Sequence, residues 1–168
     1  MKIQDEFLGE KEFKIIQNIM LGGSFTWGYS SVIDYSDDKD RYQFCHHFYN
    51  KGIPISNYVD MLNPLLEKIN AFQIQRIKSN LLTRTTDITP NSYHVDIGDL
   101  EEQEEKLRQW TTAIYYVNTN NGYTEFEDGT KVESVANRFV AFPANMMHRG
   151  TSCTDEKIRV LINFNFFV

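Results

Sequence analysis

The sequence is poor in three features, each of which would mark a particular class of protein. Only two cysteines occur, Cys45 and Cys153, so no disulfide framework is expected and both are predicted to be free thiols. No apolar run approaches the roughly 18 residues that a membrane-spanning helix needs. Lysine and arginine number 17 against 23 aspartates and glutamates, and this formal net charge of −6 argues against a nucleic-acid partner, because phosphate binding needs clustered cations.

The first residues also lack the marks of an export signal. The segment MKIQDEFLGE has neither a basic start nor an apolar stretch. We therefore expect a cytoplasmic protein with no membrane partner. The 168 residues are expected to form a single domain, 1–168, which is large enough for a hydrophobic core without disulfides.

The hydrophobic pattern changes its period along the chain. Helical spacing predicts a helix over residues 11–20 and another over 57–72, with a kink or a restart at Pro64. From about residue 73 the pattern is that of short strands, and residues 98–109 form a charged excursion that is either a short helix or a loop. The expected strands cover 72–84, 93–97, 110–118, a hairpin over 123–134 around Asp128 and Gly129, 138–144 and 158–168.

Helices followed by many short strands are typical of an α+β protein with an all-β core. We expect a double-stranded β-helix, the jelly-roll or cupin-like fold, over about residues 73–168. A helical N-terminal part, about 1–72, is expected to support this core. No internal repeat or linker composition divides the chain.

Three polar side chains stand where such a fold could bring them together. His94 and Asp96, in NSYHVDIG, are two residues apart and would share one face of a strand. His148 follows a later strand, at a position that a jelly roll can bring to the same barrel mouth. Two histidines and one carboxylate with open positions make the facial triad of non-haem Fe(II) oxygenases. The alternative is a surface aspartate and two unrelated histidines.

The last strand adds a second observation. Alternation in EKIRVLINFNF places Arg159 on one face with Leu161 and Asn163, while the opposite face is wholly apolar. A buried arginine is rare unless it is paired. Because no acidic residue stands near it in the strand, its partner is either a distant acid or the carboxylate of a ligand, which a guanidinium binds with two parallel hydrogen bonds.

At this point the sequence resembles a known family. The segments YHVD, TAIYYVNTNNGYTEFEDGT, ANRFVAFPANMMHRG and RVLINF look like those of the 2-oxoglutarate- and Fe(II)-dependent oxygenases. Within that family they are similar to the prolyl-4-hydroxylase-like branch of bacteria and phages. The resemblance covers about residues 80–168 and, more loosely, the N-terminal helices. Its motifs are specific because their order, spacing and flanking strands all agree.

The resemblance implies roles for six residues. His94, Asp96 and His148 would hold Fe(II). Arg159 would bind the distal carboxylate of 2-oxoglutarate, Tyr116 would donate its hydroxyl to that carboxylate, and Asn163 would lie beside them on the face of Arg159. One position departs from the family, since Leu82 stands where a tyrosine often lines the co-substrate pocket.

The resemblance also implies a reaction. An enzyme of this family hydroxylates a substrate C–H bond with O2 and converts 2-oxoglutarate to succinate and CO2. The branch suggests a prolyl residue of a peptide or protein as the substrate. A basic peptide is one expectation, because acidic residues cluster in two segments of the chain, 34–40 and 99–105; the alternative is that both segments are solvated loops.

Two other readings stay open at this stage. One is an oxygenase that acts on a small molecule or a nucleobase. The other is a non-catalytic jelly roll that binds a sugar or a peptide. Among the remaining residues, His46 and His47 are expected to be packing or surface residues, Gly122 to serve a turn, and Gly150 to permit a backbone conformation near the metal.

Overall fold

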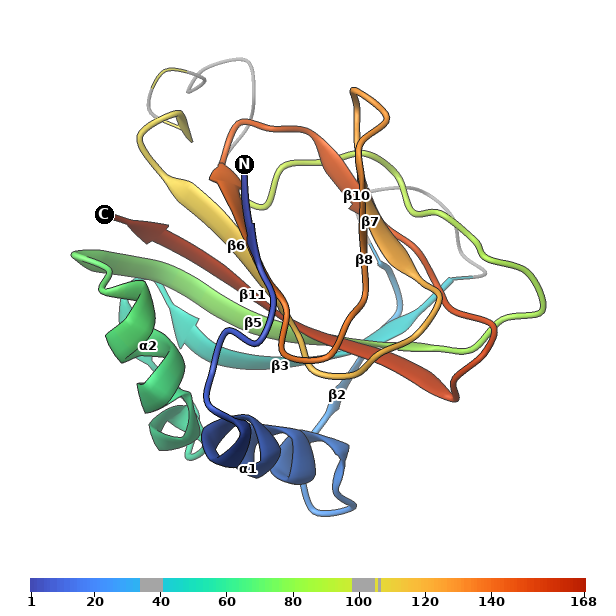
Figure 1. Cartoon of the computed structure of the whole chain (residues 1–168), viewed down its shortest axis with the longest axis horizontal. Coiled ribbons are helices and arrows are strands. Elements are labelled where there is room, and N and C mark those ends of the chain that lie inside the picture. Colours follow the sequence, from blue (N-terminus) through green and yellow to red (C-terminus); the bar gives the residue numbers. More distant parts are fainter. Residues whose placement is uncertain (34–40, 98–104, 106) are drawn as a thin grey trace.

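The computed structural model describes residues 1–33, 41–97, 105 and 107–168. Two antiparallel sheets face each other as a jelly roll, and the helices lie on the outer face of the larger sheet (Figure 1). In strand order, the large sheet is β1 (Lys2–Gln4), β9 (Phe139–Pro143), β6 (Thr111–Tyr116), β11 (Ile158–Phe167), β5 (Gln73–Thr83), β3 (Gln43–Asn50) and β2 (Gly28–Ser30), with β4 (Ile53–Pro54) paired to β3. The small sheet is β10 (His148–Gly150), β7 (Tyr123–Phe126) and β8 (Lys131–Glu133).

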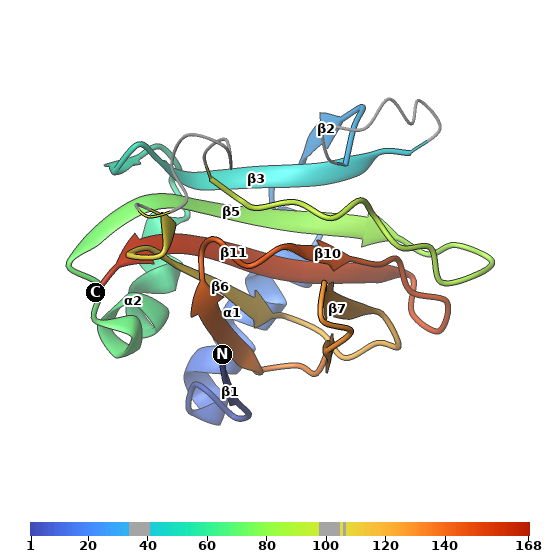
Figure 2. The same cartoon turned by 90° about the horizontal axis from the view of Figure 1, so that it is seen from above.

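Figure 2 shows β3, β5, β11 and β6 side by side, with β7 and β10 crossing the inner face of the large sheet. The jelly roll predicted from the sequence is therefore confirmed. The hairpin predicted around Asp128 and Gly129 is also confirmed, as β7 and β8. Gly129 has a φ of +85°, a conformation that a tight turn demands and that glycine adopts without strain.

The helices begin close to where the periodicity predicts them. Helix α1 covers Glu10–Leu21, and its buried residues Phe13, Ile16 and Met20 face the sheet. The second predicted helix is a short 3-10 helix, η1 (Val59–Leu62), followed by α2 (Asn63–Ile69). Pro64 stands in the first turn of α2, where its missing N–H has no helical acceptor, so the predicted restart is confirmed. Within the described residues, no helix combines the length and the apolar character needed to cross a membrane.

The central strand β11 separates two hydrophobic clusters. Its residues Val160, Ile162 and Phe164 pack with the helices, in the largest cluster of buried side chains. Leu161, from the opposite face, packs in a second cluster between the two sheets. The alternation read from the sequence is therefore confirmed, and it directs Arg159 and Asn163 towards the space between the sheets.

Two details differ from the sequence-based expectations. The first 72 residues are not only helical, because they also contribute β1 to β4 to the large sheet. Residues 93–97 were predicted to form a strand, and this prediction is wrong. The segment makes a single isolated bridge, at His94, and a second isolated bridge lies just before it, at Pro90.

The physical reason is a mismatch in spacing. The two bridges pair Pro90 with Thr151 and His94 with His148, so one side has an extra residue between them. An extra residue interrupts a β ladder, and Pro90 has no N–H to contribute to it. The two acidic segments lie almost wholly outside the described residues, and so does most of the segment 98–109, which was expected to be a short helix or a loop.

Asn137 fastens the N-terminal segment to the sheet. Its side chain accepts hydrogen bonds from the Leu8 N–H (2.9 Å) and the Tyr115 hydroxyl (2.8 Å), and its Nδ2 donates to the Leu8 carbonyl (2.9 Å). Its φ of 63° lies in the left-handed region, which asparagine tolerates better than most residues. The buried backbone of Leu8 therefore depends on one side chain for both of these hydrogen bonds.

Replacing Asn137 by alanine is expected to lower the free energy of unfolding by about 3 kcal/mol, because buried polar groups lose their partners and alanine is strained in this conformation. Asn70 is a matched control, since its φ of 51° is also left-handed and, within the described residues, no hydrogen bond fixes its side chain. Asn70→Ala should cost only about 1 kcal/mol. Urea denaturation measures both, and equal losses would show that the hydrogen bonds of Asn137 contribute little.

Candidate metal centre

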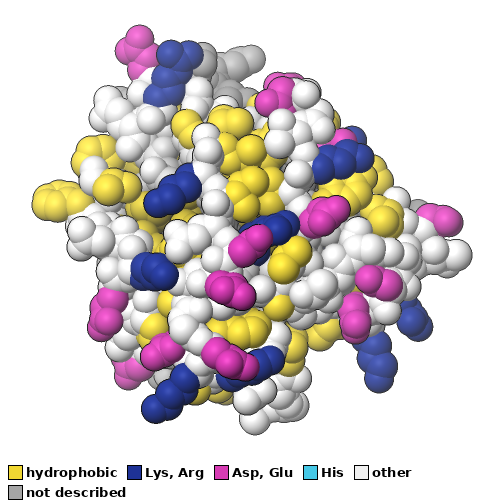
Figure 3. Space-filling model, in the orientation of Figure 1, with side chains coloured by type: hydrophobic (Ala, Val, Ile, Leu, Met, Phe, Trp, Pro, Cys, Tyr) yellow, Lys and Arg dark blue, Asp and Glu magenta, His cyan; other side chains and the backbone are white. Residues whose placement is uncertain are grey.

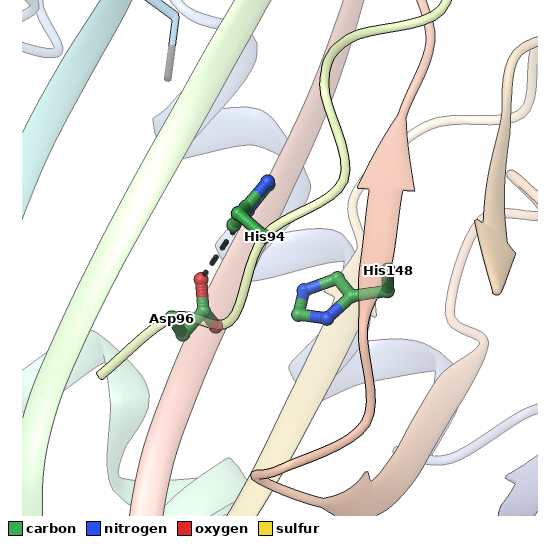
Figure 4. A group of neighbouring side chains, drawn as sticks. All are labelled: His94, Asp96 and His148. Carbon is green, nitrogen blue, oxygen red and sulfur yellow. Dashed lines mark ion pairs between the residues drawn. The ribbon is translucent and has the colours of Figure 1, made fainter. Parts of the chain in front are cut away.

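Three potential metal ligands lie close together and point towards one another (Figure 4). His94 and Asp96 come from the segment after β5, and His148 is the first residue of β10. One ligand atom from each residue lies within 4.8 Å of the others. The structure therefore brings together the three side chains that were selected from the sequence.

The backbone explains why the two imidazoles are neighbours. The His94 N–H donates to the His148 carbonyl (2.9 Å), and the His148 N–H donates to the His94 carbonyl (3.1 Å). Directly opposed residues of an antiparallel bridge project their side chains to the same side. The ring centroids are accordingly 5.0 Å apart. Asp96, two residues after His94, projects to the same side, with its Oδ1 3.9 Å from His94 Nε2.

Hydrogen bonds to the backbone orient both rings. His94 Nδ1 lies 3.1 Å from the Ser92 carbonyl oxygen, and His148 Nδ1 lies 3.0 Å from the Met146 carbonyl oxygen. An Nδ1–H that donates to such a carbonyl leaves Nε2 with a free lone pair. This is the arrangement in which histidine binds a metal through Nε2, with a backbone acceptor that fixes the tautomer.

Asp96 is held by two further residues. Arg76 Nη2 lies 3.1 Å from Asp96 Oδ1, and Asn165 Nδ2 donates to Asp96 Oδ2 (3.2 Å). Asn165 is itself fixed, because its Nδ2 also donates to the Thr112 hydroxyl (3.0 Å) and its Oδ1 accepts from Arg76 Nε (3.0 Å). Burial by itself would raise the pKa of Asp96, but the positive charge of Arg76 and of the histidines and the Asn165 hydrogen bond lower it to about 2. The carboxylate is therefore ionised at neutral pH.

Burial acts differently on His148, which is 3% exposed. Desolvation lowers its pKa from the ordinary value of 6.5, although the nearby Asp96 carboxylate opposes this effect. The neutral imidazole, which is the form that binds a metal, therefore predominates at pH 7.

This lowered pKa makes the stability of the metal-free protein depend on pH. A folded-state pKa below 6.5 means that the unfolded chain binds the proton more readily, so the contribution is fully present above pH 6.5 and is lost as the pH falls through the folded-state value. We expect the free energy of unfolding of chelator-treated protein to decrease below pH 6.5. Urea denaturation between pH 7.5 and 5.5 measures it. His148→Gln should flatten the slope, and an unchanged slope would contradict the assignment.

Arg159 occupies a different part of the same cavity. It is 1% exposed, and its Nε donates to the Ser134 hydroxyl (2.8 Å) while its Nη2 donates to the Thr124 hydroxyl (3.3 Å). Its Nη1 has no hydrogen-bond partner. In the described part of the chain no carboxylate pairs with it, so the distant-acid alternative finds no support there. A buried guanidinium with a vacant donor is costly unless a ligand completes it.

Tyr116 lies beside this arginine but uses its hydroxyl elsewhere. Its ring centroid is 5.8 Å from the Arg159 guanidinium, and its O–H donates to Thr124 Oγ1 (2.8 Å). Thr124 therefore accepts hydrogen bonds from both residues, and its own hydroxyl proton is left for the cavity that it lines. Sequence reasoning missed Thr124, because a threonine in a hairpin strand carries no distinguishing pattern.

The triad and Arg159 line one cavity of about 230 Å³. Asn163 also lines it, is 8% exposed and has an unpartnered Oδ1, while Tyr116 stands just behind the wall. Leu82 lies directly opposite Arg159 in the β5–β11 register and contributes an apolar side chain where the family often has a tyrosine. The roles predicted for Asn163 and Tyr116 stay predictions.

Two glycines leave space around Arg159, and neither has a positive φ. A Cβ on Gly122 would lie 2.7 Å from Arg159 Cδ and 2.7 Å from the Ser152 carbonyl oxygen. A Cβ on Gly150 would lie 3.3 Å from Arg159 Nη1, the vacant donor. The two glycines are therefore explained by close approach to the arginine rather than by a special backbone conformation.

The other two histidines do not join the triad. His46 packs against Phe25 and Phe48, and its ring nitrogens lie 2.7 Å from the Thr26 carbonyl and the Ser56 hydroxyl. His47 is exposed on β3. The expectation that both are packing or surface residues is confirmed.

Figure 3 shows one face of the molecule, on which cationic and acidic side chains are interspersed rather than segregated.

Comparison with known proteins supports the fold only through structure. No protein-family profile matches the chain, and no curated protein matches it. Solved structures do match. A viral collagen prolyl hydroxylase from Paramecium bursaria Chlorella virus-1, in complex with 2-oxoglutarate, has a TM-score of 0.65 at 13% identity, covering 99% of this chain and 95% of that one.

Two other solved structures with the same fold contain a bound peptide or a bound small molecule. A Trichoplax adhaerens prolyl hydroxylase, in complex with a hypoxia-inducible factor peptide, has a TM-score of 0.70 at 13% identity, covering 99% of this chain and 82% of that one. HygX from Streptomyces hygroscopicus, with nickel, 2-oxoglutarate and hygromycin B bound, has a TM-score of 0.61 at 9% identity, covering 98% and 81%. The chain therefore has the fold of prolyl hydroxylases and related 2-oxoglutarate oxygenases.

Proposed function

We propose that the protein is a 2-oxoglutarate- and Fe(II)-dependent dioxygenase that hydroxylates a C–H bond of its substrate, at a prolyl residue of a peptide or protein. The observation that carries this proposal is the pairing of two features in one cavity. A two-histidine, one-carboxylate triad lines this cavity, and a buried guanidinium with a vacant donor lines it as well.

The residues of the cavity suit both the metal ion and the 2-oxoglutarate that such an enzyme binds. For the metal, His94 and His148 present Nε2 atoms whose rings are oriented through Nδ1, and Asp96 is ionised. For 2-oxoglutarate, Arg159 offers Nη1, and Gly150 leaves room beside that atom. Imidazole and carboxylate suit Fe(II), and they admit Zn or Mn as well.

The chain's own residues would divide the work as follows. His94, Asp96 and His148 would hold the metal, while Arg76 and Asn165 keep the carboxylate in position. When bound, the iron and 2-oxoglutarate together supply the activation of O2 that hydroxylates the substrate and yields succinate and CO2.

Arg159 would bind the distal carboxylate, and Ser134 and Thr124 would orient its guanidinium through the hydrogen bonds described above. Tyr116 would act through Thr124, whose free hydroxyl proton can be donated to the same carboxylate. Ile114, Leu161 and Leu82 give the cavity an apolar wall, which limits the access of water to the bound co-substrate.

The size of the cavity favours a polypeptide substrate. A volume of about 230 Å³ is below the roughly 300 Å³ at which drug-sized ligand pockets begin. With 2-oxoglutarate inside, little space is left for a second molecule to be enclosed, so a substrate would present one residue at the mouth. The peptide complex of the Trichoplax adhaerens hydroxylase is in keeping with this.

Three narrower proposals concern the substrate class and the cellular location, and each rests on one observation. A basic peptide is suggested by the acidic segments, which lie mainly outside the described residues. An aminoglycoside-like or other small substrate is the second candidate, because HygX has hygromycin B bound on the same fold. A cytoplasmic location is supported by the two free thiols, Cys45 and Cys153.

Succinate formation tests the proposal. The purified protein, supplied with Fe(II), ascorbate, O2 and 2-oxoglutarate, is expected to release succinate, and release should rise when a proline-containing peptide is added. Mass spectrometry should then detect one added oxygen atom on the peptide. Absence of succinate under all conditions would favour the non-catalytic binding module, and succinate without peptide oxidation would favour a small-molecule substrate.

A further inference from the structure

The wall formed by β3 and β5 carries polar groups that the proposed chemistry does not use. Gln43, Lys78 and Asn80 all line the cavity of the triad. They come from the inner face of the two strands, the same face that carries Arg76. We call these three residues the β3–β5 wall.

Gln43 presents a buried acceptor whose orientation is determined by its other atoms. It is 2% exposed, and its Nε2 donates to the carbonyls of Val32 (3.2 Å) and Ile33 (2.8 Å). Its Oε1 therefore faces away from these carbonyls, and it has no hydrogen-bond partner. The Oδ1 of Asn80 is also buried and unpartnered. Ionised 2-oxoglutarate has acceptors only, so it cannot satisfy either oxygen.

Lys78 adds a cation to the same wall. In the β11–β5–β3 register it lies directly between Asn163, which is buried, and His47, which is exposed. It is therefore on the solvent side of the cavity, whereas Arg159 is fully buried. No carboxylate of the described residues pairs with Lys78, and its charge acts on the thiol of Cys45 and on the imidazole of His47, which lies opposite it on β3.

The neighbouring cation, Arg76, differs in this respect. Its guanidinium is committed to Asp96 and Asn165. Arg159 faces the proposed co-substrate site. Apart from Arg159, Lys78 is thus the cation of the cavity whose described surroundings leave it without a negative partner, and the same wall carries two acceptor oxygens that call for N–H or O–H donors.

We propose, on the basis of the proposed function, that the β3–β5 wall binds the substrate and that the substrate is an acidic peptide. A side-chain carboxylate next to the reacting residue would pair with Lys78, and N–H groups of the peptide would donate to Asn80 Oδ1 and Gln43 Oε1. This selects against the basic peptide that the acidic segments suggest, because a cation beside Lys78 would be repelled.

Binding of a matched peptide pair tests the proposal. Two fluorescent peptides share one central proline and differ only in carrying glutamates or lysines beside it. The protein, loaded with Mn²⁺ and 2-oxoglutarate, is expected to bind the acidic peptide roughly tenfold more tightly at low salt, with the difference shrinking at high salt. Equal affinities, tighter binding of the basic peptide, or no binding of either would overturn it.

Variants assign the preference to Lys78. Lys78→Met is expected to remove most of the preference, and Lys78→Glu to reverse it, while the exposed helical control Lys11→Met keeps it. Asn80→Leu should weaken both peptides alike, because the bonds assigned to it do not depend on side-chain charge. An unchanged preference in Lys78→Met would overturn the proposal, and so would a matching loss of 2-oxoglutarate affinity, which would place Lys78 on the co-substrate.

Peptide binding and succinate release test the substrate class and the oxygenase activity separately. Peptide anisotropy reports the charge preference of the wall without any turnover. Succinate release in the absence of peptide reports the proposed oxygenase activity without the wall. Preferential binding without succinate would contradict the activity, whereas succinate without a preference for the acidic peptide would contradict only the substrate class.

Discussion

Replacing His148 by alanine is expected to lower the affinity for a divalent metal by more than roughly 100-fold, since loss of an outer-shell partner alone costs 10- to 100-fold. His148 supplies one of three ligands, and its ring is both buried and oriented by the Met146 carbonyl. Succinate formation should fall to background in the same variant. Calorimetric titration with Mn²⁺, a redox-stable substitute for Fe(II), measures the affinity directly.

His47 provides the control for this experiment. It is an exposed histidine of β3 that does not belong to the triad. His47→Ala should retain metal affinity within a factor of about two. A His148→Ala protein that binds Mn²⁺ as the unaltered chain does would remove the basis for the metal centre, and circular dichroism would exclude misfolding as the cause of a loss.

Substituting Gly122 by alanine is expected to damage the co-substrate site although Gly122 makes no contact with a ligand. The added Cβ would meet Arg159 Cδ at 2.7 Å and the Ser152 carbonyl oxygen at 2.7 Å. The carbonyl belongs to the backbone and cannot turn away, so the arginine must move. We expect the affinity for 2-oxoglutarate to fall by at least roughly tenfold and the stability to fall by about 1–3 kcal/mol, as for other overpacked sites.

Gly23→Ala is the matched control, because a Cβ at Gly23 meets no atom within 4 Å and its φ is not positive. This variant should bind 2-oxoglutarate as the unaltered chain does. Calorimetry of the Mn²⁺-loaded proteins measures both affinities. A Gly122→Ala protein with unaltered 2-oxoglutarate affinity would show that Arg159 does not hold the co-substrate in its present position.

Local sequence patterns were sufficient for much of the fold and for the triad. Alternation in β11 separated the core face of Val160 and Ile162 from the cavity face of Arg159, because one strand has a period of two wherever it lies. His94 and Asp96 were placed on one side for the same reason. Their segment is nevertheless not a strand, since pairing depends on a partner whose spacing the sequence does not reveal.

The residues that were missed or given another role were those that depend on contacts between distant segments. Arg76, which was missed, reaches Asp96, and Gly122, which was expected to serve a turn, gives space to an arginine on another strand. For Arg76 a signal was present, because it shares an alternating polar face with Lys78 and Asn80 in β5. That face could have been read as the inner wall of a cavity rather than as a solvated surface.

The two edge strands of the large sheet affect how readily the protein associates with itself. Both outermost strands, β1 and β2, have only three residues, so few backbone N–H and C=O groups are offered to another chain. Removing the first four residues would uncover β9, whose sequence is FVAFP. An apolar edge strand whose backbone N–H and C=O groups are unpaired is a template for pairing with another chain. A protein that lacks the first four residues should therefore be prone to self-association and fibre growth.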